Sequence, residues 1–431
     1  MTATLSRPAL MIAAPASGQG KTTVTAALAR LHRLRGRRVR VFKCGPDFLD
    51  PQIHAIASGA PCENLDFRMC GESDVAWRLS RAARDADLIL IEGVMGLFDG
   101  APSAAELARR FDLPILVVID GGAMARSFGA IALGLKVYEP NTRLIGALAN
   151  SVASDRHTDM LRASLPEDIN WYGAIPREAS LAIPERHLGV LPAAEIDGLS
   201  EKLDLLANSI SNTAASDLPP SASFPDVPEP ATVPTLAGKT IAIARDAAFC
   251  FIYPANIECL HSLGAKTVFF SPLTDSELPP CDAVWIPGGY PELHALRISK
   301  NRSMVASLVM HVEAGKPLLA ECGGMMAIAE SLTDLEGVQH PMMGLIPGTT
   351  VMHRKLVALG MQTLSLQGGC LGGHTFHYST FSTSLQAVTH ATKFQHGKGE
   401  AVYQHRRLTA TYFHAYFPSA PEVAAHLFSS P

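Results

Sequence analysis

The feature that most constrains this chain is a glycine-rich turn near its N-terminus, Ala14-Pro-Ala-Ser-Gly-Gln-Gly-Lys-Thr-Thr23. It lies between an apolar strand-like run and a helix-like one, which is the setting of a phosphate-binding loop. Two glycines allow backbone N–H groups to turn toward phosphate oxygens, a lysine adds positive charge, and a threonine hydroxyl can reach Mg²⁺. The residues expected to bind the nucleotide are Ser17, Gly18, Gly20, Lys21, Thr22 and Thr23.

One departure from the strict pattern is Pro15, which stands five residues before Gly20, where the first glycine is usual. The small residue lies one place earlier, at Ala14, so the loop is longer by one residue. A glycine-rich turn without a ligand is the alternative interpretation. The strand before the turn and the helix after it favour phosphate binding.

Short apolar runs separated by helix-length segments predict an α/β fold with buried parallel strands. In the first half of the chain they are residues 9–14, 38–43, 87–92, 113–120 and 143–150. The alternation restarts after residue 238 and predicts a second α/β domain. Its expected strands are residues 240–245, 266–270, 282–286 and 316–321.

The segment from Ser211 to Pro234 is rich in serine and alanine, contains six prolines and has no hydrophobic periodicity. Such a composition predicts an extended interdomain linker. We therefore expect a first domain over residues 1–210, a linker over 211–237 and a second domain over 238–431.

Composition excludes several classes of function. The net charge is −4 and the basic run from Arg33 to Arg40 is short, so nothing favours binding to nucleic acid. No apolar stretch approaches the roughly 18 residues of a membrane span, and the N-terminus is unlike a signal peptide. We expect a cytoplasmic protein that does not bind a membrane. The eight cysteines show no paired spacing, which disfavours a zinc site and a disulfide framework.

Several carboxylates stand where predicted strands end, at the edge where an open α/β sheet binds its ligand. They are Asp47, Asp50, Glu92 and Asp99, with Asp120 a weaker candidate. Glu92 closes an apolar strand, so solvation alone does not explain it. The three other leading candidates lie beside glycine or proline, and for them a turn or helix cap is a serious alternative. Phosphoryl chemistry needs such groups to hold Mg²⁺.

Cys322 ends a second apolar strand and is followed by two glycines and a helical stretch. This is the pattern of a nucleophile elbow, in which the following N–H groups lower the thiol pKa and stabilise an oxyanion. We expect Gly323 and Gly289 to donate to the oxyanion, the latter from the turn Pro287-Gly-Gly-Tyr290. His414 is the favoured general base, with His374 and His377 as competitors.

With these segments identified, the chain resembles the cobyrinate and hydrogenobyrinate a,c-diamide synthases. The resemblance rests on SGQGKTT, FKCGPDFLDP, CENLDFRM, IEGVMGLFDG, IPERHLGV, ARDAAFCFIYPAN, PGGYPELHA, AECGGMMAI, GHTFHYS and YFHAYFPSAP. It implies a dethiobiotin-synthetase-like P-loop domain that binds ATP and Mg²⁺, joined to a class I glutamine amidotransferase domain. It further implies ATP-dependent amidation of the a and c acetate groups of a corrin, through a phosphorylated carboxylate and ammonia from glutamine. We expect a homodimer.

The resemblance places catalytic roles on Cys322, His414, Asp47, Asp50 and Asp99, and metal binding on Thr22, Asp47 and Glu92. The chain departs from the family at Ala14-Pro15, where Gly-Thr is usual, and at Tyr416. In the amidotransferase motif His-Pro-Glu, the glutamate stands two residues after the histidine and orients it. Here that position is Tyr416, so another group must orient His414. Cobyric acid synthase, CTP synthase and a nucleotide switch with an inactive cysteine domain are the alternatives.

Overall fold

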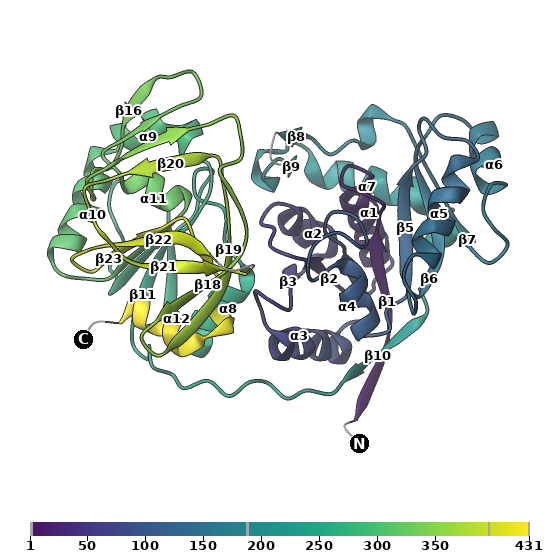
Figure 1. Ribbon diagram of the computed structural model, residues 1–431, viewed down its shortest axis with the longest axis horizontal. Coiled ribbons are helices and arrows are strands. Elements are labelled where there is room, and N and C mark those ends of the chain that lie inside the picture. Colours follow the sequence, from purple (N-terminus) through teal and green to yellow (C-terminus); the bar gives the residue numbers. More distant parts are fainter. Residues whose placement is uncertain (1–2, 187–188, 395–396, 430–431) are drawn as a thin grey trace. The chain divides into compact units, whose positions relative to one another are not determined.

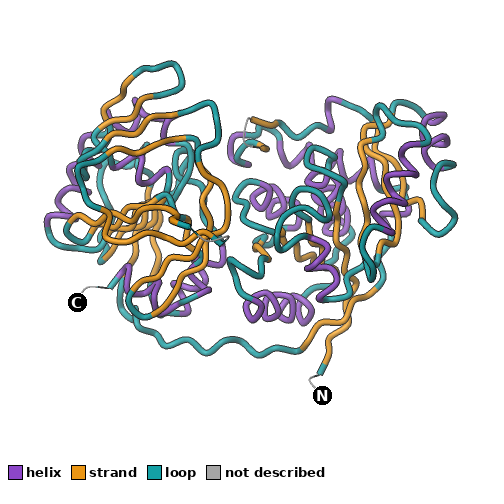
Figure 2. Tube along the Cα trace, in the orientation of Figure 1, coloured by secondary structure: helices purple, strands orange, loops and turns teal. Residues whose placement is uncertain are grey.

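The computed structural model describes residues 3–186, 189–394 and 397–429. Its contacts divide the chain into two compact units, Met1–Phe67 with Glu72–Glu229, and Arg68–Gly71 with Pro230–Pro431. Figures 1 and 2 show sheets and helices in each unit. Within the described residues, no helix combines the length and apolar character needed to cross a membrane.

The first unit is built on a sheet with the strand order β3-β2-β4-β1-β5-β6-β7, in which all neighbours are parallel. Its strands are β1 (Thr4–Ala13), β2 (Val39–Cys44), β3 (Glu63–Leu65), β4 (Leu88–Glu92), β5 (Ile115–Asp120), β6 (Leu144–Val152) and β7 (Asn170–Pro176). The five predicted strands are confirmed. Their apolar residues are buried because covered parallel sheets have no solvent face.

Except for α7, which follows the last parallel strand, the helices of this unit connect successive parallel strands (Figure 1). They are α1 (Lys21–Leu34), α2 (Asp50–Ser58), α3 (Glu72–Asp85), α4 (Ala104–Arg110), α5 (Ser127–Val137), α6 (Asp155–Arg162) and α7 (Leu199–Ile210). A small hairpin, β8 (Glu185–Arg186) with β9 (Gly189–Val190), follows β7. His187 and Leu188 of the IPERHLGV motif lie outside the described residues.

The prediction of an extended linker over 211–237 is wrong for residues 211–229. Residues up to Glu229 belong to the first unit, and Ser221–Pro225 form β10, which pairs antiparallel with the start of β1. The strand has two buried side chains, Ala222 and Phe224, separated by an exposed serine. Two apolar residues are too few to show a period in the sequence, and the partner strand lies more than 200 positions earlier.

The second unit contains a mixed sheet with the strand order β12-β11-β13-β14-β23-β22-β21-β18-β19-β24. The parallel strands are β11 (Thr240–Ala244), β12 (Lys266–Phe270), β13 (Ala283–Ile286), β14 (Leu318–Glu321) and β23 (Leu408–Thr411). The four strands predicted from sequence are confirmed, and both α/β units agree with the expected fold class.

An antiparallel extension continues this sheet, and a smaller sheet accompanies it. The extension contains β18 (Ala358–Leu366), β19 (Gly369–His377), β21 (Ala387–Lys393), β22 (Lys398–His405) and β24 (His414–Ala415). The smaller sheet has β15 (Ser331–Thr333), β16 (Gln339–Pro341), β17 (Thr349–Met352) and β20 (Ser379–Ser382). The helices are α8 (Pro254–Ser262), α9 (Ala295–Lys300), α10 (Arg302–Glu313), α11 (Gly323–Ile328) and α12 (Pro421–Phe428).

Candidate active site

The glycine-rich turn of the first unit joins β1 to α1 and leaves little room for side chains. Gly20 has φ 98°, and a Cβ atom there would collide with the side chain of Asn150. Lys21 begins α1, and its Nζ donates to the carbonyl oxygens of Ala16 (3.0 Å) and Met95 (2.6 Å). Burial, opposed by the Glu92 carboxylate, lowers the pKa of Lys21 to about 8. The turn thus holds the Lys21 ammonium beside the backbone N–H groups at the start of α1.

Glu92, at the end of β4, is the centre of the polar cluster beside this turn. Its Oε1 accepts from the Thr22 hydroxyl (2.9 Å) and from Nζ of Lys43 (2.8 Å), and its Oε2 is bonded to Nε2 of His54. Burial opposes ionisation, but Lys43 and His54 hold the pKa of Glu92 below its ordinary value. A buried carboxylate with these partners is ionised and fixed in place.

Lys43 ties the end of β2 to the start of α2. Its Nζ lies 2.5 Å from Oδ2 of Asp50 and 3.6 Å from Oδ2 of Asp47. Asp47 also accepts from the backbone N–H groups of Leu49 (2.8 Å) and Asp50 (3.2 Å), so it stabilises the turn that precedes α2 as well. Burial and the neighbouring Asp50 raise the pKa of Asp47 to about 7.

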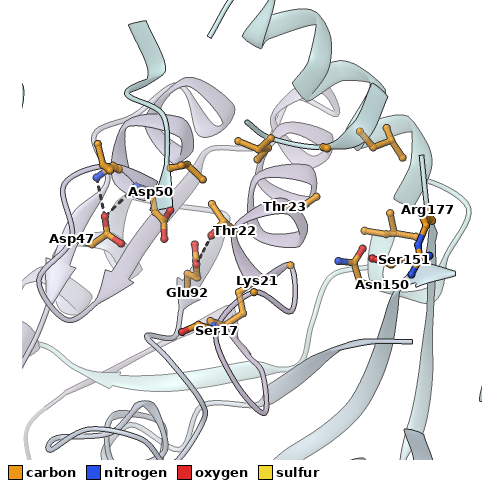
Figure 3. Close-up of a pocket in the computed structure, with 18 of the residues that line it drawn as sticks. Ser17, Lys21, Thr22, Thr23, Asp47, Asp50, Glu92, Asn150, Ser151 and Arg177 are labelled. Atoms are coloured by element: carbon orange, nitrogen blue, oxygen red, sulfur yellow. Dashed lines mark hydrogen bonds between the residues drawn. The ribbon is translucent and has the colours of Figure 1, made fainter. Parts of the chain in front are cut away.

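These groups line one cavity of about 680 Å³ (Figure 3). The predicted nucleotide-binding residues line it together with Asp47, Asp50 and Glu92. Asn150, Ser151 and Arg177 lie across the cavity from Asp47 (Figure 3), and Ile175, Leu181, Ile183 and Val190 add apolar lining. The same cavity is therefore lined by the polar residues around the phosphate loop and by a group of apolar side chains.

Two further acidic candidates, the leading candidate Asp99 and the weaker candidate Asp120, lie outside this lining and stabilise turns. Asp99 is exposed and accepts a hydrogen bond from the backbone N–H of Gly96 (3.0 Å). Asp120 accepts from the N–H of Gly122 (2.8 Å). Both contacts match the turn-forming alternative.

Sequence reasoning missed Lys43 and His54. Lys43 closes the apolar strand β2 with only 3% of its surface exposed, and His54 is fully buried in α2. A lysine at the end of a buried strand is as anomalous as a glutamate there, so Lys43 carried a usable signal. His54 carried none, because its pairing with Glu92 depends on how α2 packs against β4.

In the second unit, Cys322 connects β14 directly to α11 in a strained backbone conformation. Its φ of 47° and ψ of −108° are rare for a residue with a side chain, and its N–H donates to the Thr411 carbonyl (2.7 Å). The elbow is therefore present. The expected low thiol pKa is wrong, because burial raises the pKa of Cys322 and outweighs the bond from the Gly323 N–H.

The elbow continues into a glycine turn at Gly323. A second glycine turn, at Gly288 and Gly289, lies close to it together with His414. A Cβ at Gly323 would approach the Gly289 nitrogen to 2.8 Å, and one at Gly288 would approach Cε1 of His414 to 2.5 Å. These positions accept only glycine at such distances. Cys322, the two glycine turns and His414 are therefore brought together by β13, β14 and β24.

The ring of His414 stacks on the ring of His374. His414 and His374 face each other across β24 and β19, with ring centroids 4.9 Å apart and planes 15° apart. The Tyr253 hydroxyl lies 3.1 Å from Nδ1 of His374. Burial lowers the pKa of His414 well below its ordinary value, and His374 adds to the effect. A neutral His414 ring is thus available to accept a proton.

The competing candidate His377 has a different set of partners from His414. Its ring stacks on Tyr412 (3.8 Å, 10°), its Nδ1 bonds to the Ser379 carbonyl (2.8 Å), and its Nε2 lies 3.2 Å from Oε1 of Glu400. Both ring nitrogens therefore have partners. Cys322 Sγ lies 3.9 Å from the carbonyl oxygen of Phe376, so this segment also borders the thiol.

Comparisons with known proteins agree with this two-part geometry. Residues 10–190 match the family described as the CobQ/CobB/MinD/ParA nucleotide binding domain, and residues 240–422 match the CobB/CobQ-like glutamine amidotransferase domain. Fold and site thus define an ATP-binding, glutamine-dependent ligase.

Relatives along the whole chain identify the family. The chain is 53% identical to hydrogenobyrinate a,c-diamide synthase of Stutzerimonas stutzeri, over 97% of this chain and 98% of that one. It is 52% identical to the enzyme of that name from Pseudomonas aeruginosa, over 97% of both chains. Cobyrinate a,c-diamide synthase of Herminiimonas arsenicoxydans is 49% identical over 97% and 96%. The chain belongs to the cobyrinate and hydrogenobyrinate a,c-diamide synthase family.

Proposed function

We propose that this enzyme amidates the a and c acetate carboxylates of cobyrinic or hydrogenobyrinic acid, using ATP, Mg²⁺ and ammonia from glutamine. The observation that carries the proposal is the cavity of the first unit, in which a phosphate loop meets Lys43 and three carboxylates. The corrin substrate is inferred from the names of the relatives, and the elbow at Cys322 is the proposed ammonia-releasing centre.

The residues present fit ATP with Mg²⁺. The backbone from Ser17 to Gly20 and the Lys21 ammonium would hold phosphate oxygens. Thr22 and Glu92, already 2.9 Å apart, offer the hard oxygen ligands that Mg²⁺ prefers, with Asp47 nearby. The described residues contain no cluster of three or more His, Cys, Asp or Glu able to cage a metal, which suits an ion that arrives with the nucleotide. When bound, ATP would supply the phosphoryl group that activates a carboxylate, and Mg²⁺ would neutralise charge on its phosphates.

Lys43 would neutralise negative charge beside the activated carboxylate. It is buried between Asp50 and Glu92, whose charges keep its pKa above the ordinary value in spite of burial. A fixed, permanently charged ammonium stabilises developing charge without having to reorganise.

The second unit would release ammonia by covalent catalysis. Cys322 Sγ attacks the carboxamide carbon of glutamine, His414 takes the thiol proton and returns it to the departing nitrogen, and ammonia leaves as a thioester forms. Water then attacks the thioester carbon, which releases glutamate and restores the thiol. The Gly289 and Gly323 N–H groups would stabilise the oxyanion. Because burial keeps the thiol protonated, a neutral imidazole is needed to activate it.

The decisive experiment incubates the pure protein with ATP, Mg²⁺, glutamine and either cobyrinic or hydrogenobyrinic acid, and reads product masses. Each amidation replaces OH by NH₂, so the monoamide and the diamide are distinguished by their masses. The expected result is a diamide that forms only when ATP is present. Addition of more than two amide groups would instead support the cobyric acid synthase alternative, and steady absence of product would support a nucleotide switch.

A further inference from the structure

A buried carboxylate outside the proposed reaction joins three strands of the amidotransferase unit. Glu321, the last residue of β14, has 2% of its surface exposed. Its Oε1 accepts from the backbone N–H of Ala415 (2.9 Å), and its Oε2 accepts from Nε1 of Trp285 (2.8 Å). One side chain thus connects the residue before the thiol, the residue after His414 and β13, which leads into the glycine turn at Gly288.

A second buried polar side chain holds the backbone of the same residue, Ala415, at its carbonyl group. Asn256 of α8, with 1% of its surface exposed, donates from Nδ2 to the Ala415 carbonyl (2.8 Å). Its Oδ1 accepts from the N–H of Phe417 (2.8 Å). Ala415 is therefore held at its N–H by Glu321 and at its C=O by Asn256. Buried groups of this kind are costly unless they are paired, so the arrangement has one well-defined geometry.

We propose that Glu321 and Asn256 are positioning residues for the ammonia-releasing reaction, fixing the backbone of β24 so that the His414 ring stays against Gly288 and within reach of Cys322. The proposal rests on the proposed function of the second unit. It assigns to two buried side chains the orienting task that a glutamate performs in the motif His-Pro-Glu, at the position that Tyr416 occupies in this chain. Tyr416 is fully buried and packs against Tyr253, with ring centroids 5.7 Å apart.

The test uses Glu321→Gln in the full chain, which preserves size and removes one acceptor. The amide oxygen can serve only one of the two donors, and the NH₂ group must then face another N–H. We expect glutaminase kcat to fall roughly 10- to 100-fold with KM for glutamine within about threefold, because binding does not require the His414 ring. Amidation driven by added ammonium chloride should stay within about twofold.

Adding Trp285→Phe to Glu321→Gln separates positioning from folding. The phenyl ring has no N–H, so the amide oxygen can turn to Ala415 and the facing donors disappear. We expect the double variant to recover at least about threefold in kcat over Glu321→Gln. Asn256→Asp should reproduce the loss in kcat, since a carboxylate accepts from Phe417 but cannot donate to Ala415. Glu313→Gln, an exposed change on α10, is the matched control and should be unaffected.

Several outcomes would overturn the proposal. They are full kcat in Glu321→Gln, a rise in KM without loss of kcat, a parallel loss of the ammonia-driven reaction, and no recovery in the double variant. Absence of glutaminase from the unaltered enzyme, or labelling of a cysteine other than Cys322 by 6-diazo-5-oxonorleucine, would overturn the function proposed for the unit itself.

Discussion

His32 is a buried residue of α1 whose charge state should set the acid stability of the first unit. Its Nδ1 lies 2.7 Å from Nη1 of Arg37, which can only donate, so the ring must be neutral there. Burial first, and then Arg37, lower its pKa from 6.5 to about 4. The unfolded chain therefore binds a proton before the folded one does, and stability is lost as the pH falls from about 6.5 to 4.

We predict that this residue contributes about 3 kcal/mol of that loss, since each pKa unit is worth about 1.4 kcal/mol. His32→Gln keeps an acceptor that does not titrate, so urea unfolding between pH 7 and 4 should show a shallower decline. His426→Gln, on the exposed face of α12, is the control and should leave the pH dependence unchanged. An unaltered decline in His32→Gln would contradict the assignment.

His414 carries the second prediction at the residue scale. If its ring transfers the Cys322 proton, His414→Asn should lower glutaminase turnover by roughly two to four orders of magnitude while glutamine binding changes little. His377→Asn provides the comparison, since both nitrogens of that ring are already engaged. Full activity in His414→Asn together with loss in His374→Asn or His377→Asn would move the base to β19.

At the scale of elements, strands with continuous apolar runs were predictable and short or polar ones were not. The run Ile115–Asp120 identifies itself because both faces of a covered parallel strand are buried. The antiparallel strand β18 buries only Gln362 and Leu364 among its nine residues, which offers little hydrophobic signal. β10 was not predicted for a related reason, since only two of its side chains are buried.

β10 yields a prediction of stability. Phe224 is fully buried and its ring lies 6.4 Å from that of Phe111, so Phe224→Ala should destabilise the first unit by about 3–5 kcal/mol in urea unfolding. Val233, which follows in the chain and is 61% exposed, is the control, and its change to alanine should remain within about 0.5 kcal/mol. Equal, small effects would mean that residues 221–225 do not contribute to the fold of this unit.

Element packing also decides which parts of the site could be foreseen. Glycine turns, Cys322 and carboxylates at strand ends are local patterns, and the structure brings most of them into two sites. Lys43 with Glu92, and Glu321 with Ala415, are pairs separated by 49 and 94 positions, formed only when strands align. Their residue types are visible in sequence, but their partners depend on register and helix packing.

At the scale of the molecule, the two units carry separate chemistry, so defects in them should be separable. Cys322→Ala removes the nucleophile, and we expect glutamine-dependent amidation to disappear while added ammonia still supports the ATP-dependent reaction. Glu92→Gln should do the reverse. It removes a charge that holds Thr22, Lys43 and His54, so ammonia-dependent amidation should fall at least about 100-fold, whereas basal glutaminase should remain measurable.

Mixing the two variants tests whether ammonia made in one chain is used in another. An equimolar mixture of Cys322→Ala and Glu92→Gln should regain little glutamine-dependent activity if ammonia passes within one chain, because released ammonia would be diluted into the solvent. High ammonium chloride should restore the Cys322→Ala component alone. Loss of the ammonia-driven reaction in Cys322→Ala would mean that the thiol is needed for the fold. Near-normal amidation in Glu92→Gln at saturating Mg²⁺ would mean that this carboxylate neither binds the ion nor orders the cavity.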